Sequence, residues 1–104
     1  MLNTLYVVPD QNEEHLSAPE LAELFSRECG IRPLPYMQRA FAQFLQEGFE
    51  PLMLQEVIFR TAMAPRPSWA YLDAILRNCR SEGIFDYVKF MTRRHDVKRH
   101  DWPI

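Results

Sequence analysis

The chain has 104 residues, 47% of them hydrophobic, and a formal net charge of −2 at pH 7. These values are typical of one small globular domain. No run of about 18 apolar residues occurs, which argues against a membrane-spanning helix, and we expect no secretory signal because no basic segment precedes a long apolar stretch. Two cysteines, Cys29 and Cys79, are too few to indicate a disulfide framework, so we expect reduced thiols and a cytoplasmic location.

The two halves of the chain differ in charge. Residues 1–56 carry 9 acidic and 3 basic side chains, a net charge of −6, whereas residues 57–104 carry 5 acidic and 9 basic ones, a net charge of +4. A surface that binds phosphate groups is therefore expected in the C-terminal third. The alternative is a solvated helix end followed by a charged tail.

The first 16 residues predict an extended arm. Leu5 to Val8 is a short run with strand propensity that Pro9 stops, and one isolated run cannot form a sheet. We expect this arm to pack on the domain or on another molecule.

Helix signals follow in close succession. Ser17 and Glu20 have the spacing of a capping box, so a helix is expected from there to Gly30. Pro35 suits the first turn of a second helix, which is expected to stop at Gly48. The residues expected to face the core from these two helices, at spacings of three and four, are Leu21, Leu24, Phe25, Met37, Phe41, Phe44 and Leu45.

Three more helices are expected in the second half. One starts at Pro51 and is ended by Pro65, the next is capped by Ser68 and closed by Gly83, and the last spans residues 84–94. Short links with proline or glycine and no alternating strands predict an all-α fold, a small orthogonal bundle of about five helices between the arm and a basic tail at 95–104. The residues expected to face inward are Leu54, Val57, Ile58, Thr61, Phe85, Val88 and Met91.

The sequence has no pattern typical of an enzyme. All three glycines lie at expected helix ends, so a glycine-rich loop that binds phosphate is not predicted. His95 and His100 are five residues apart, which does not place them on one helical face, and no cysteine is near them in sequence. No serine or cysteine lies in a nucleophile motif. We therefore expect a non-catalytic protein without a metal or cofactor.

The most informative segment is residues 68–84, SWAYLDAILRNCRSEGI in one-letter code. It resembles the penultimate helix of the DnaD-like domain, found in bacterial and phage replication-initiation proteins, whose pattern is Tyr-Ile-x-x-Ile-Leu-x-x-Trp-x-x-x-Gly-Ile, often after an aromatic residue. The stretches 32–34 and 48–51 resemble turns of the same family, so the likeness covers roughly residues 20–90. The residues that carry the main pattern here are Trp69, Tyr71, Ile75, Leu76, Gly83 and Ile84.

The resemblance implies an accessory protein of the primosome that binds DNA without sequence specificity and acts with partner replication proteins in helicase loading. In the family, a Tyr-x3-Ile-x3-Trp set is implicated in DNA binding together with the helix and tail that follow, and Cys79 replaces that tryptophan here. Family members usually carry a winged-helix domain ahead of this one, so we expect a fragment or a minimal version. The candidate DNA-binding residues are Tyr71, Ile75, Arg77, Arg80, Lys89, Arg93, Arg94, Lys98 and Arg99.

Several of these assignments have alternatives. Tyr71 and Ile75 could pack in the core instead of contacting DNA, and Tyr87 and Phe90 could either stack on bases, as could Trp102, or face the core. The alternative function is a protein–protein docking or oligomerisation module without direct DNA binding, which contacts its partner through the arm and the acidic first half. A domain of this size has a modest core, so a homo-oligomer is a further possibility.

Overall fold

The structure is a computed structural model, and it describes residues 16–96 and the side chains of residues 16–92. The described part of the chain forms five helices and no strand, which confirms the predicted all-α class. The predicted arm, apart from Leu16, and the tail beyond Asp96 lie outside the described residues. The helices are α2 (Ala18–Cys29), α3 (Pro35–Glu47), α4 (Pro51–Ala62), α5 (Trp69–Ser81) and α6 (Tyr87–Asp96).

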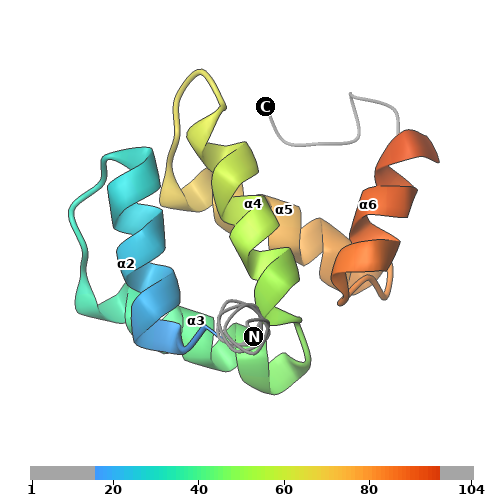
Figure 1. Cartoon of the computed structure of the whole chain (residues 1–104), viewed down its shortest axis with the longest axis horizontal. Coiled ribbons are helices and arrows are strands. Elements are labelled where there is room, and N and C mark those ends of the chain that lie inside the picture. The colour runs from blue at the N-terminus through green and yellow to red at the C-terminus, as the bar shows by residue number, and fades with distance from the viewer. Residues whose placement is uncertain (1–15, 97–104) are drawn as a thin grey trace, which may run out of the picture.

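Helix α4 is the centre of the bundle, since it packs against α2, α5 and α6. Figure 1 shows α2 and α4 side by side, with α3 crossing one end of the pair and α5 crossing behind α4. Helix α6 lies at the opposite edge of the molecule from α2. No described helix has both the length and the apolar character needed to span a membrane.

The first helix begins and ends as its sequence predicts. The Ser17 backbone N–H donates to Glu20 Oε1 at 2.8 Å, and the Glu20 N–H donates to Ser17 Oγ at 3.4 Å, which completes the capping box. At the other end Gly30 has φ 69°, a left-handed conformation that costs glycine little, and its N–H donates to the Ser26 carbonyl.

The middle helices also follow their local signals. Pro35 and Pro51 occupy the first turns of α3 and α4, and α4 ends at Ala62, shortly before the predicted stop at Pro65. The Ser68 hydroxyl accepts the Tyr71 N–H at 3.1 Å and so caps α5. Proline and N-cap chemistry therefore fixes these boundaries without help from distant residues.

The last helix departs from the prediction. It begins at Tyr87, three residues later than expected, because the Asp86 carboxylate accepts the Lys89 N–H at 2.6 Å and acts as the cap. Ile84 is instead buried just after α5, with its N–H donating to the Cys79 carbonyl at 2.8 Å. The expectation that Val88 faces inward is wrong, since it is 72% exposed, and Phe90 at 1% fills the core position.

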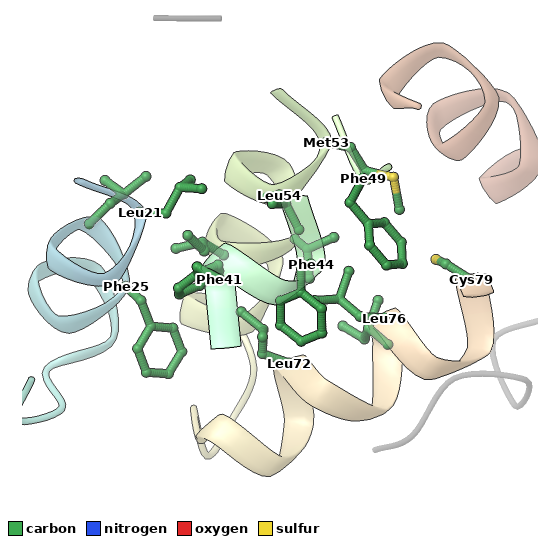
Figure 2. Close-up of a cluster of buried hydrophobic side chains, with 14 of the residues drawn as sticks. Leu21, Phe25, Phe41, Phe44, Phe49, Met53, Leu54, Leu72, Leu76 and Cys79 are labelled. Atoms are coloured by element: carbon green, nitrogen blue, oxygen red, sulfur yellow. The ribbon is translucent and has the colours of Figure 1, made fainter. Parts of the chain in front are cut away.

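One apolar core runs through the bundle. Figure 2 shows Phe41 and Phe44 of α3 among leucines of α4 and α5, and every helix contributes to the cluster. Trp69 lies at the edge of this core, where the rings of Phe25 and Phe41 meet it edge to face at centroid distances of 5.2 and 5.4 Å. Leu45 is only partly buried, whereas the other predicted core residues of α2, α3 and α4 are buried: Leu21, Leu24, Phe25, Met37, Phe41, Phe44, Leu54, Val57, Ile58 and Thr61.

Candidate nucleic-acid interface

The stripe that carries the family resemblance faces the core. Ile75 is 3% exposed and Cys79 is buried, and in Figure 2 the Cys79 side chain points toward Phe49 of the link before α4. Tyr71 is partly buried and packs against the same cluster. Of the candidate residues Tyr71 and Ile75, only Tyr71 therefore keeps surface that a ligand could touch. The cysteine fits this place because a small apolar side chain suits a packed interior.

Arg77 and Arg80 are exposed on α5, but both are paired with carboxylates. Arg77 donates to Asp73 Oδ2 with Nη2 at 2.6 Å and Nε at 3.1 Å. Arg80 donates in the same two-pronged way to Glu47 Oε1, at 2.7 and 3.1 Å, and so joins α5 to the end of α3. Such surface pairs are weak, about 0–1 kcal/mol, but each leaves its neighbourhood electrically neutral. The two arginines therefore add little positive potential for a phosphate backbone.

Three of the five remaining basic candidates lie in α6. Lys89 is exposed, and Arg93 follows it by four residues in the same helix. Arg94 is also within α6, while Lys98 and Arg99 lie outside the described residues, as does Trp102. Between residues 89 and 99 the sequence has five basic side chains and one acidic one. Positive charge is therefore concentrated on α6 and the residues that follow it.

The aromatic residues of α6 serve mainly to attach it. Phe90 is buried, and the guanidinium carbon of Arg60 lies 5.6 Å from its ring centroid. Tyr87 and Met91 are partly buried against the core. Phe90 thus has the core role rather than a base-stacking one, and the solvent side of α6 presents Val88, Lys89 and Thr92.

Two contacts that cannot be predicted from local sequence join the N-cap of α4 to the start of α6. The Glu50 N–H donates to the Phe85 carbonyl at 2.8 Å, and Glu50 Oε1 accepts the Tyr87 N–H at 2.7 Å. These partners are more than thirty residues apart in the chain, so no local motif indicates them. Asp86 could have been found from sequence, since it stands three residues before Lys89 in an N-cap arrangement.

The described residues show little other reactive chemistry. Burial, and secondarily the charge of Glu28, raises the pKa of the Cys29 thiol to about 11, which keeps it protonated and a poor nucleophile near neutral pH. Its Sγ lies 3.9 Å from the Ile58 carbonyl oxygen. Within residues 16–92, no three histidine, cysteine or acidic side chains come together in a group that could hold a metal ion.

Comparison with known proteins gives no independent assignment. No protein-family model matches the chain, and no curated protein or solved structure matches it either. The DnaD-like resemblance thus stays a prediction based on residues 68–84 and the turns before them.

Proposed function

We propose that this protein is a non-catalytic, DnaD-like accessory protein of DNA replication initiation that binds the phosphate backbone of DNA through α6 and the basic residues after it. One observation carries the proposal: the positive side chains of α5 are paired with carboxylates, whereas Lys89 to Arg99 adds five positive charges against one negative charge at the end of the chain. The role in the primosome and in helicase loading rests on the family resemblance.

Binding of this kind is electrostatic and independent of base sequence. Lysine and arginine side chains displace counterions condensed on the phosphates, so affinity falls steeply with salt concentration. Phosphate contacts orient a protein on nucleic acid but do not read its sequence. Partner replication proteins would then determine where on a chromosome or phage genome the protein acts.

The test is a fluorescence-anisotropy titration of labelled single- and double-stranded DNA at several salt concentrations. The variant K89Q/R93Q/R94Q removes three charges from α6, while the control R32Q/R39Q/R66Q removes three exposed charges from α3 and the links. Both variants change the net charge equally. If all three α6 side chains contact phosphates, the slope of log K against log salt for duplex DNA falls by up to about 2.7 in the α6 variant alone.

Two results would reject the proposal. One is an intact chain that fails to bind either form of DNA at low salt. The other is an equal loss of affinity in the two triple variants, because that would show an effect of net charge rather than of a defined surface.

A second candidate function is an oligomerisation module without direct DNA binding. The outer face of α4 favours it, because Phe59 and Met63 lie one turn apart there and both are exposed, Met63 to 73%. The two charged residues of α4, Glu56 and Arg60, pair with each other at 2.9 Å, so their charges offset each other. A second copy over this face predicts an oligomer in light scattering that F59S/M63S converts to a monomer. A monomeric wild-type chain rules this candidate out.

A further inference from the structure

Glu50, the N-cap of α4, contacts the start of α6 with both its backbone and its side chain. Its N–H donates to the Phe85 carbonyl at 2.8 Å, which fixes the link before α6. Its Oε1 accepts the Tyr87 N–H at 2.7 Å, which satisfies one of the free N–H groups at the start of the helix. Glu50 thus holds both sides of the point where α6 begins.

The start of α6 has a second carboxylate. Asp86 Oδ1 accepts the Lys89 N–H at 2.6 Å, and Asp86 O accepts the Phe90 N–H at 3.0 Å. The cap from Asp86 is local and would form in an isolated helix. The contact from Glu50 is not local, because it comes from the N-cap of α4, and it therefore ties the start of α6 to the body of the protein. Negative charge at the N-terminus of α6 also interacts favourably with the positive end of the helix macrodipole.

Arg60 provides a further contact at the other end of α4. Its guanidinium lies against the Phe90 ring, and its Nη2 is 3.6 Å from Met91 Sδ. Ten residues of α-helix separate Glu50 from Arg60, which corresponds to about 15 Å along the α4 axis. On α6 these contacts fall on Tyr87 and on Phe90 and Met91, so they hold the first turn of the helix at two points. Figure 1 shows α6 standing at the edge of the molecule, with no other helix beyond it.

We infer that Glu50 is a positioning residue for nucleic-acid binding: it orders and orients the basic helix α6 although its own negative charge opposes DNA. This inference rests on the proposed function. A binding surface that is ordered before contact avoids the entropy cost of ordering it during binding. Positioning by Glu50 and its negative charge have opposite effects on DNA affinity. Removal of a carboxylate near the DNA would strengthen binding through charge alone, whereas loss of positioning weakens it.

The experiment compares Glu50→Ala and Glu50→Gln with Glu23→Ala, a control that removes the same charge from the exposed face of α2. Loss of one charge-assisted hydrogen bond at the start of α6 predicts DNA binding roughly five-fold weaker in Glu50→Ala. Glu50→Gln keeps an oxygen that can accept the Tyr87 N–H, so its affinity stays within about two-fold of wild type or becomes tighter. The DNA affinity of Glu23→Ala should not fall below that of the wild type.

Amide hydrogen exchange measured without DNA tests whether Glu50 orders α6, separately from whether the protein binds DNA. In Glu50→Ala, the amides of residues 87–92 should exchange faster while those of α2 stay protected, which also shows that the variant is folded. Unchanged exchange in α6, or DNA binding as tight as wild type, overturns the positioning role and leaves the DNA proposal intact. If the wild-type chain does not bind DNA, the proposed function fails, and the exchange data alone decide whether Glu50 orders α6.

Discussion

Replacement of Phe90 by alanine tests how α6 is attached to the domain. The Phe90 ring is buried and lies beneath the Arg60 guanidinium, so the substitution leaves a cavity and removes a cation–π contact. Truncation of a buried phenylalanine costs about 3–5 kcal/mol. We expect a value near the lower end, about 3 kcal/mol, because a helix at the edge of the bundle can relax toward the cavity.

The loss is large relative to the whole stability, since a domain of this size unfolds with about 5–15 kcal/mol. Chemical denaturation followed by circular dichroism measures it, and Val88→Ala is the matched control two residues away. Val88 is 72% exposed, so its truncation should change the free energy of unfolding by less than about 0.5 kcal/mol. A larger effect for Val88→Ala than for Phe90→Ala would refute the register of α6 and with it the placement of Lys89 in solvent.

Three further predictions concern local features. Ser17→Ala removes the hydroxyl of the capping box and should lower the unfolding free energy by about 1 kcal/mol in the same denaturation assay, and a neutral result would mean that the cap does not form. A double-mutant cycle on Arg80 and Glu47 should give a coupling below about 1 kcal/mol that shrinks with added salt, and a larger, salt-independent coupling would contradict an exposed pair. The Cys29 thiol should alkylate slowly at neutral pH and faster as pH rises toward 11. Because its pKa in the folded protein lies above the unfolded value of 9.0, its contribution to stability is complete below pH 9 and is lost as pH rises from 9 to about 11. An unfolding free energy that increased over that pH range would contradict this.

The helix boundaries that depend on local chemistry were predictable. The capping box at Ser17, the first-turn prolines and the left-handed glycines each act within a few residues, so their sequence spacing is enough to predict them. The all-α class followed for the same reason. The start of α6 was missed because Phe85 continues the apolar pattern, whereas the Asp86 cap and the burial of Ile84 after α5 place the boundary later.

The candidate site was less predictable, because it depends on contacts across the chain. The partner of Arg80 is 33 residues away and that of the Tyr87 N–H is 37 residues away, so charge counting could not show that one cation was neutralised and one helix start was tethered. Ile75 is buried in the core, which helical spacing alone could not show. The basic stretch itself needed no tertiary information, since it is a property of composition.

The arrangement in which α6 packs mainly on α4 has a thermodynamic consequence. A helix held largely by one neighbour can open without unfolding the rest, so its opening free energy is expected to lie below that of the bundle. A ligand that binds only the closed form raises that opening free energy by an amount set by its concentration relative to its dissociation constant. Protection of the α6 amides against exchange would then report the fraction of the protein that has ligand bound.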